Sequence, residues 1–297
     1  MVPDLTPARY RAGVTGHPIA HSKSPRLHRA AYAYLGFDCS YTAIDTPPES
    51  LGSLLSELRR EPSWRGLSVT MPHKAAALPH MDSVGPGVRE LGVINTVLAV
   101  GETDSRRLVG YNTDVEGIVR AVRQAGAAHP QRALILGGGG TAAAALAALA
   151  SMGVERVDVC VRTPEKAAPL VETGRRLGIT VELRQFAAAA GLCGASQLVI
   201  STLPPRGADG LAGSLLSEPF MASEASSGPR VLLDVAYDPW PSALAAAWSE
   251  RGGVIVPGLE MLLYQAVAQV KLFAGDVFRD ETAVINVMCD AVGAPRR

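Results

Sequence analysis

Residues 132–153, with the sequence RALILGGGGTAAAALAALASMG, decide the fold of this chain. A short apolar run leads into consecutive glycines, and the alanines and leucines that follow predict a helix starting near Thr141. The spacing G-x-G-x-x-A is met by Gly137, Gly139 and Ala142 at this strand-to-helix junction, where dinucleotide-binding βαβ units carry it. Glycine permits the tight turn and lets backbone N–H groups approach a pyrophosphate at the positive end of the helix. We therefore predict cofactor contacts from Gly137, Gly138, Gly139, Gly140 and Thr141.

Strand and helix patterns alternate along almost the whole chain. Its 297 residues exceed the usual size of a single hydrophobic core, which favours two domains. Short β-branched runs such as AGVTG, GLSVT and VLLDV are separated by helical segments, which predicts an α/β fold with mostly parallel sheets. The last forty residues pattern as two helices without a further strand, so they must pack on a domain already built. We expect a Rossmann-like dinucleotide-binding domain of residues 114–258, and a first domain of residues 1–113, completed by 259–297, to which substrate binding is left.

The charge balance points to a small-molecule partner. Twenty-eight basic residues match 28 acidic ones, which argues against a nucleic-acid or anionic-membrane surface. The four cysteines are far apart without a CxxC pair and the six histidines lack metal-ligand spacing, so neither disulfides nor a metal is expected. No run reaches the ~18 apolar residues of a membrane span, and MVPDLTPARYRAG lacks the apolar stretch of a signal peptide. We expect a cytoplasmic protein, either monomer or homodimer.

Cofactor choice depends on the residues after the second strand of the nucleotide-binding unit. An NAD enzyme would place Asp or Glu there, against the ribose 2′-hydroxyl. This chain instead has Arg162, Thr163 and Lys166, whose guanidinium, hydroxyl and ammonium groups suit a 2′-phosphate. NADP is therefore the predicted cofactor. Two alternatives stay open: Asp158 could reach the ribose if the strand were misaligned, and Arg162 and Lys166 could merely solvate a loop.

The first domain offers a pair of groups suited to proton transfer. GLSVTMPHK delivers Lys74 just beyond the carboxyl end of a buried-type strand, and GYNTDVEG places Asp114 at the start of a helix. A carboxylate that orients an ammonium can tune it as a proton donor to the alkoxide formed by hydride transfer. Singly, Lys74 could be a surface charge and Asp114 a helix cap.

A second polar motif, SKSP, precedes the first helix. Ser24 followed by Pro25 has the chemistry of an N-cap and N1 pair, which would be a purely structural role. Ser22 lies outside that helix and could join Ser24 in holding a carboxylate. The spacing alone leaves both interpretations open.

Eight segments together resemble the shikimate dehydrogenase family, in order and over nearly the whole chain: HSKSP, GLSVTMPHK, GVINT, GYNTD, LGGGGTAAA, VRTPEK, DVAYDPWP and GLEMLLYQAVAQ. The resemblance implies a first domain with a mixed sheet, a Rossmann-like second domain and a C-terminal helix pair that returns to the first. It also implies the reversible NADPH-dependent reduction of 3-dehydroshikimate to shikimate, a step of aromatic amino-acid (chorismate) biosynthesis.

The resemblance further assigns roles to individual residues. It implies Lys74 and Asp114 as the catalytic pair. Polar contacts to the shikimate carboxylate and hydroxyls would come from Ser22, Ser24, Thr70, Asn95 and Gln265, with Tyr237 near the substrate. Gly258 and Met261 would lie beside the nicotinamide, and we also expect Thr202 to contact the cofactor.

The chain departs from the family pattern at three positions. Ser68 stands where many members have Asn, Val161 replaces the Asn that usually precedes the Arg–Thr pair, and Lys166 replaces a frequent Arg. The last two would weaken the hold on the 2′-phosphate and make NADP preference modest. The competing hypotheses are an NAD-preferring quinate/shikimate dehydrogenase and a non-catalytic module that senses NADP or shikimate. Intact Lys74 and Asp114 argue against the second.

Overall fold

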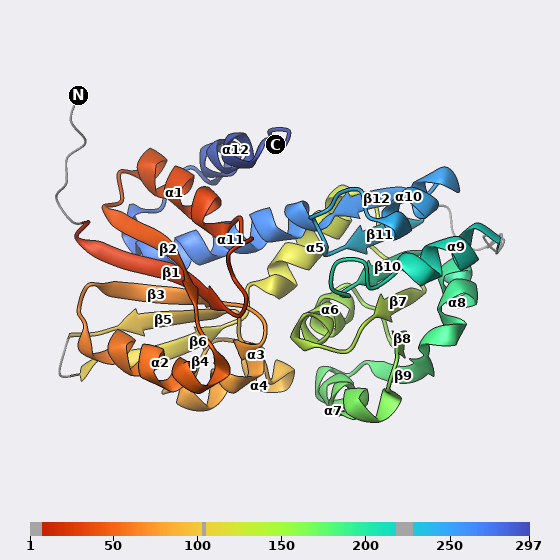
Figure 1. Ribbon diagram of the computed structural model, residues 1–297, viewed down its shortest axis with the longest axis horizontal. Coiled ribbons are helices and arrows are strands. Elements are labelled where there is room, and N and C mark those ends of the chain that lie inside the picture. The colour runs from red at the N-terminus through yellow and green to blue at the C-terminus, as the bar shows by residue number, and fades with distance from the viewer. Residues whose placement is uncertain (1–7, 103–104, 218–227) are drawn as a thin grey trace. The chain divides into compact units, whose positions relative to one another are not determined.

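The computed structural model describes residues 8–102, 105–217 and 228–297. The chain divides into two compact units, Met1–Thr113 with Gln265–Arg297 and Asp114–Tyr264. Within the described residues each unit contains one six-stranded sheet covered by helices (Figure 1). The expected α/β fold of two domains is confirmed. The chain returns to the first unit inside helix α11 (Gly258–Ala274), at residue 265 instead of the expected 259.

The first unit has a mixed sheet with the strand order β2-β1-β3-β5-β6-β4. Its strands are β1 (Tyr10–Gly16), β2 (Cys39–Asp45), β3 (Trp64–Val69), β4 (Ser83–Val84), β5 (Thr96–Val100) and β6 (Arg107–Tyr111). Strand β1 is parallel to β2 and β3, and β4 is parallel to β6. Strand β5 runs antiparallel to both of its neighbours, β3 and β6. Three of the five pairings made by the described strands are therefore parallel.

Helices cover both faces of this sheet (Figure 1). They are α1 (Ser24–Leu35), α2 (Leu51–Arg60), α3 (His73–Ala76), α4 (Val88–Leu91), the C-terminal part of α11 and α12 (Glu281–Val292). Leu51, Leu55 and Leu58 recur at helical spacing along α2 and are buried in one apolar cluster with Trp64 and Leu67 of β3. On the other face α12 packs against α1, so the C-terminal helix completes the first unit, as expected.

The second unit has an all-parallel sheet with the order β12-β11-β10-β7-β8-β9, which is the Rossmann arrangement. Its strands are β7 (Ala133–Leu136), β8 (Arg156–Val161), β9 (Thr180–Gln185), β10 (Leu198–Ser201), β11 (Val231–Asp234) and β12 (Val254–Pro257). Its helices are α5 (Asp114–Gln124), α6 (Gly140–Ser151), α7 (Ala168–Leu177), α8 (Ala189–Ala195), α9 (Asp209–Ser217), α10 (Ala243–Glu250) and the start of α11. The strands β7, β10 and β11 are buried throughout, as expected of a parallel sheet covered on both faces.

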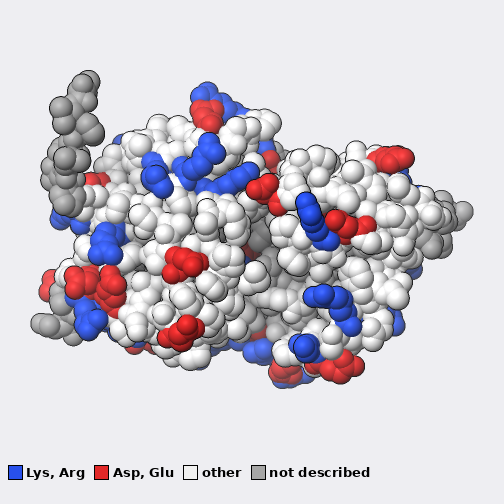
Figure 2. All heavy atoms as spheres, viewed as in Figure 1, with Lys and Arg blue, Asp and Glu red and all other residues white. Residues whose placement is uncertain are grey.

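Three features bear on the class of protein. Among the described helices none has the length and apolar character to cross a membrane. Basic and acidic side chains are interspersed over the face of the molecule that Figure 2 shows. The cysteines at 39, 160, 193 and 289 are all buried and carry free thiols.

Candidate functional site

The first unit brings several chain segments to one edge of its sheet. The pairings that align this edge are Gly16 with Asp45, Thr15 with Val69, Ser68 with Thr96 and Thr96 with Tyr111. Strands β1, β2, β3 and β6 therefore end where β5 begins. Thr70 follows β3 directly, Asn95 precedes β5 directly, and Thr113 lies two residues beyond β6. The sheet topology thus gathers polar residues that are far apart in the sequence, at the carboxyl edge where ligand chemistry concentrates in α/β sheets.

The start of α1 differs from the predicted cap. The N-cap residue is Lys23, in helical conformation and without a side-chain cap bond, and Ser24 is the first helical residue. Ser24 is therefore not the N-cap, and Pro25 occupies the second helical position. The oxygen that accepts at this end is Ser22 Oγ, which receives the Ser24 backbone N–H at 3.3 Å. The physical reason is that the helix begins one residue earlier than predicted, because Lys23 already has helical φ and ψ.

Lys74 is held in place through its backbone. It lies on the short helix α3 and is half-buried, and its carbonyl accepts the N–H of Ile94 at 2.9 Å. The preceding residue, His73, is fully buried and donates from Nε2 to the carbonyl of Thr46 at 2.7 Å. Thr70 is anchored likewise, since its N–H donates to the carbonyl of Thr15 at 2.9 Å. The backbone around Lys74 is thus fixed at the sheet edge.

Asn95 organises a buried polar cluster. Its Nδ2 donates to Thr113 Oγ1 at 2.8 Å and to Gln265 Oε1 at 3.3 Å. Its Oδ1 accepts the Thr113 backbone N–H and the Thr96 hydroxyl, both at 2.8 Å. All four residues are buried. Two of the predicted substrate contacts, Asn95 and Gln265, are therefore in direct contact with each other.

Asp114 is buried, with 4% of its surface exposed, and is the first residue of α5. An acidic residue in the first turn of a helix interacts favourably with the helix dipole. Thr113, the residue before it, is fixed by Asn95 through both its N–H and its hydroxyl. The pairing of Asp114 with Lys74 stays a prediction.

The second unit contains the glycine-rich turn. Helix α6 starts at Gly140, one residue earlier than expected, and its N-cap is Gly139. Gly137 has φ of +106°, and a Cβ there would lie 2.5 Å from Thr202 Oγ1, so only glycine fits. A Cβ on Gly138 would lie 3.1 Å from the Val161 side chain, which is also tight.

Gly139 differs from its neighbours. It is exposed, and a Cβ built there would meet no atom of the part of the chain that the structure describes within 4 Å. Close packing therefore explains Gly137 and Gly138 but not Gly139. Open space over the N-terminus of a twelve-residue helix fits the pyrophosphate of a dinucleotide, which the backbone N–H groups would bind.

The residues expected to bind the 2′-phosphate follow β8. Arg162, Thr163 and Lys166 are all exposed, and within the described residues no hydrogen bond or ion pair is formed by the side chains of Arg162 and Lys166. Asp158 is instead aligned with Leu134 in mid-strand and accepts from Arg184 Nε at 2.8 Å. The Asp158 carboxylate is thus bonded to a side chain of the neighbouring strand β9. Arg162 is therefore the better candidate for contact with the 2′ position of the ribose.

The other expected cofactor residues lie around the ends of β10, β11 and β12. Thr202 Oγ1 donates to the carbonyl of Leu136 at 2.9 Å, which ties β10 to the glycine-rich turn. A Cβ on Gly258 would lie 2.1 Å from the Val235 carbonyl oxygen, so α11 can begin here only with glycine. Met261 is buried and Tyr237 is half-buried.

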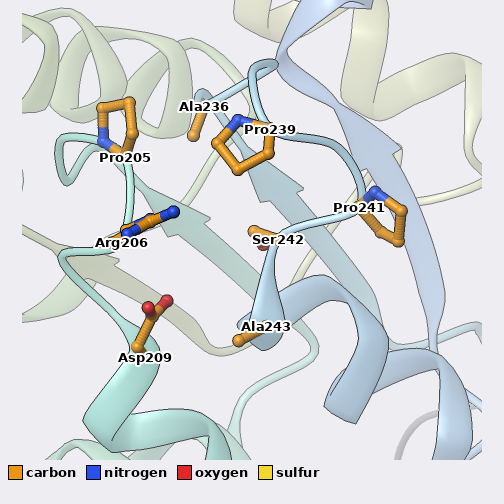
Figure 3. A pocket seen from close by; sticks show the side chains of 8 residues that line it. All are labelled: Pro205, Arg206, Asp209, Ala236, Pro239, Pro241, Ser242 and Ala243. Atoms are coloured by element: carbon orange, nitrogen blue, oxygen red, sulfur yellow. The ribbon is translucent and has the colours of Figure 1, made fainter.

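A small cavity of about 110 Å³ lies beyond β10 and β11 (Figure 3). It is lined by Pro205, Arg206, Asp209, Ala236, Pro239, Pro241, Ser242 and Ala243. One of the lining residues, Ser242, caps α10 and donates from Oγ to Asp234 Oδ2 at 2.6 Å. Burial raises the pKa of Asp234, while its hydrogen bonds oppose that rise. Sequence reasoning missed this cavity and Asp234.

Sequence reasoning also missed the polar residues behind the first site. Gln269 is 1% exposed and contacts Ser68, Thr96 and the Asn95 carbonyl. The segment QAVAQ places it four residues after Gln265, on the same side of a helix, and this spacing could have revealed it. Among the described residues no group of three or more His, Cys, Asp or Glu side chains could hold a metal ion.

Comparison with known proteins agrees with this geometry. Residues 14–97 match the family model of the shikimate dehydrogenase substrate binding domain. The shikimate dehydrogenase (NADP(+)) of Rubrobacter xylanophilus is 37% identical over 277 residues, covering 92% of this chain and 94% of that protein. The shikimate dehydrogenase structure from Mycobacterium tuberculosis is 38% identical with a TM-score of 0.80, covering 96% of this chain and 99% of that one.

A further structure extends the likeness to a complex. The shikimate 5-dehydrogenase of Thermus thermophilus, solved with NADP(H) and shikimate, is 30% identical with a TM-score of 0.75. The alignment covers 95% of this chain and 99% of that one. Since curated relatives above 30% identity align over nearly the full length of both chains, this protein belongs to the shikimate dehydrogenase family.

Proposed function

We propose that this chain is an NADP-dependent shikimate dehydrogenase, which reversibly reduces 3-dehydroshikimate to shikimate in the biosynthesis of aromatic amino acids. The observation that carries the proposal is the full-length likeness to NADP-dependent shikimate dehydrogenases. The buried polar cluster of Asn95, Thr113 and Gln265 at the edge of the first sheet supports it, because a polyhydroxylated acid needs several fixed donors and acceptors.

The first unit supplies the substrate contacts in this proposal. The hydroxyls of Ser22 and Ser24 bind the carboxylate. Ser22 lies just before α1 and Ser24 is its first residue, so the two hydroxyls are close enough in the chain to reach one carboxylate. The ring hydroxyls and the carbonyl are bound by Thr70, Asn95 and Gln265, with Tyr237 beside the substrate. Each of these side chains is neutral, so recognition depends on hydrogen bonds made in a partly buried environment.

Lys74 and Asp114 carry the proton transfer. NADPH, when bound, supplies the hydride that adds to the carbonyl carbon of 3-dehydroshikimate. The Lys74 ammonium then gives a proton to the carbonyl oxygen, which becomes the new hydroxyl. Asp114, with a buried carboxylate at a helix N-terminus, orients Lys74 and accepts a hydrogen bond from a substrate hydroxyl. In the oxidative direction Lys74 takes the proton back.

The second unit binds the cofactor. The turn of Gly137, Gly138, Gly139, Gly140 and Thr141 would hold the pyrophosphate, for which the open space over Gly139 leaves room. Arg162, Thr163 and Lys166 bind the 2′-phosphate, and Thr202, Gly258 and Met261 border the nicotinamide end. We further propose that the protein is cytoplasmic, as its buried free thiols suit a reducing compartment. It acts on small molecules as a monomer or homodimer, and binds neither nucleic acid nor membrane.

The test is a set of four initial rates, for shikimate and quinate, each with NADP and with NAD. We expect the highest kcat/KM for shikimate with NADP. A higher value for quinate with NAD would replace the proposal by a quinate/shikimate dehydrogenase. An absence of turnover with all four pairs, in protein that still binds NADP, would indicate a sensing homologue.

A further inference from the structure

A continuous row of buried polar side chains lies behind the substrate-binding cluster of the first unit. Its members come from β2, β3, α11, β5 and the residue directly before β5, and they are 6% exposed or less: Tyr41, Ser68, Gln269, Thr96, Asn95 and Gln265. Consecutive members are joined by hydrogen bonds of 2.6 to 3.3 Å. Buried networks of this kind are costly unless every member is satisfied, so the arrangement calls for an explanation.

The direction of the hydrogen bonds is fixed at Gln269. Its Nε2 donates to the Asn95 backbone carbonyl at 3.1 Å and to Thr96 Oγ1 at 2.9 Å. Because a carbonyl can only accept, the amide nitrogen must face Asn95 and the amide oxygen must face the other way. That oxygen accepts the Ser68 hydroxyl at 2.7 Å. Ser68 has then used its proton, so Tyr41 is the donor in the 2.6 Å bond between the two hydroxyls.

The same logic continues toward the substrate contacts. Thr96 Oγ1 accepts from Gln269, and its own proton goes to Asn95 Oδ1 at 2.8 Å. The Thr113 backbone N–H reaches the same oxygen, which turns Asn95 Nδ2 toward Gln265 Oε1. Gln265 therefore uses its oxygen on Asn95, and its amide N–H groups are oriented away from this bond as donors.

We propose that Gln269 is a positioning residue for substrate binding, which holds Asn95 and Gln265 in place by bonding the Asn95 carbonyl and Thr96, and so reinforces the amide orientation that the Thr113 N–H gives Asn95. Its effect is to present amide N–H donors of Gln265 to an oxygen acceptor of a hydroxylated carboxylic acid. The proposal rests on the proposed function, because it assigns Gln265 to the substrate. A glutamine is required, since only a side-chain amide of this length donates two hydrogen bonds on one side and accepts one on the other.

Two substitutions separate orientation from packing. Gln269→Glu keeps the shape, but its ionised form cannot donate to Asn95 or Thr96; Gln269→Met keeps the volume and removes all polar atoms. The control is Val270→Ala, at the next residue of α11, which is fully buried and loses only apolar contacts. Thr96→Val, which removes a single hydroxyl from the middle of the row, decides the question if the Gln269 variants do not fold.

The measurements are the Kd of shikimate by calorimetry, kcat, both KM values and Tm. Both Gln269 variants should bind shikimate roughly 10- to 50-fold more weakly, and Thr96→Val about 5-fold or more, because buried polar groups of the row lose their partners and Asn95 and Gln265 are held less firmly. The kcat should stay within about 3-fold and KM for NADP should not change, since the reacting groups are intact. Val270→Ala should lower Tm and leave the Kd unchanged.

The outcomes distinguish this inference from the proposed function. If the parent binds and oxidises shikimate while the Gln269 and Thr96 variants keep its Kd, the positioning role is wrong and the function stands. An equal loss of affinity in Val270→Ala would also overturn the inference, because general loosening of α11 would explain the result. A parent that neither binds nor oxidises shikimate would contradict the proposed function, and the inference with it.

Discussion

Replacing Arg162 by alanine tests the cofactor assignment. Arg162 directly follows β8 and is exposed, and its guanidinium makes no hydrogen bond or ion pair with the described residues, so the parent loses no internal contact on substitution. The substitution removes a charge-assisted contact to the 2′-phosphate, worth about 2–3 kcal/mol. Its loss should raise KM for NADP by tens to a hundredfold. NAD has no phosphate there, so its KM should hardly change. The assay is kcat/KM for both cofactors at saturating shikimate and constant ionic strength.

A matched control lies on the same strand. Arg156, at the opposite end of β8, is exposed and forms an ion pair with Glu182. Arg156→Ala removes the same charge from the same unit, so it reports any long-range electrostatic effect on cofactor binding. An NADP/NAD ratio that stays the same in Arg162→Ala, or falls equally in Arg156→Ala, would refute the assignment of Arg162 to the 2′-phosphate.

Three further predictions concern the first unit and its border. Ser22→Ala and Ser24→Ala should each raise KM for shikimate by an amount equivalent to about 1.5–3 kcal/mol. Only Ser22→Ala should also lower Tm, because the Ser22 hydroxyl accepts the Ser24 backbone N–H. Unchanged KM values would exclude both residues from the carboxylate site. Asp114→Asn should lower kcat and raise KM together, since the carboxylate both orients Lys74 and contacts substrate, and a change in KM alone would leave it only a binding role. Burial lowers the pKa of His28 to about 4, and among the described residues its Nε2 has no hydrogen-bond partner, so protonation is favoured in the unfolded chain. The unfolding free energy should therefore be level above pH ~7 and fall by about 3 kcal/mol between pH ~6.5 and ~4. Denaturation of His28→Phe over the same pH range should lack that decline, and an equal decline would assign it to other groups.

The fold was largely predictable because its signals are local. The glycine-rich turn after an apolar run specifies a βαβ unit, and the short apolar runs of β7 and β10 are typical of parallel strands buried on both faces. The sequence patterns do not indicate strands β4, β5, β6 and β9. Strand β9 alternates charged and apolar residues at the edge of its sheet and is only partly buried, so its apolar signal is weak. Strand β5 is antiparallel in an otherwise parallel context, and such a pairing depends on neighbours distant in sequence.

The site was predictable where a motif fixes both residue type and place. Gly137 needs a positive φ and close contact with Thr202, which a sequence pattern captures. The Ser24 cap was predicted wrongly, because a one-residue shift in the helix start transfers the accepting oxygen to Ser22. Gln269 escaped notice because its importance arises from contacts with β3 and β5, which only the tertiary structure reveals.

The most direct test of the proposed chemistry is the kcat for NADP-dependent oxidation of shikimate in Lys74→Ala, with Lys74→Arg as its companion. If Lys74 transfers the proton, Lys74→Ala should lower kcat by ~10²–10⁴-fold with KM for shikimate little altered. Lys74→Arg should be almost as slow, because a guanidinium keeps the charge but does not release its proton near neutral pH. A Lys74→Ala enzyme with near-parental kcat would contradict the account, and so would full recovery in Lys74→Arg, which would reduce the role of Lys74 to that of a positive charge.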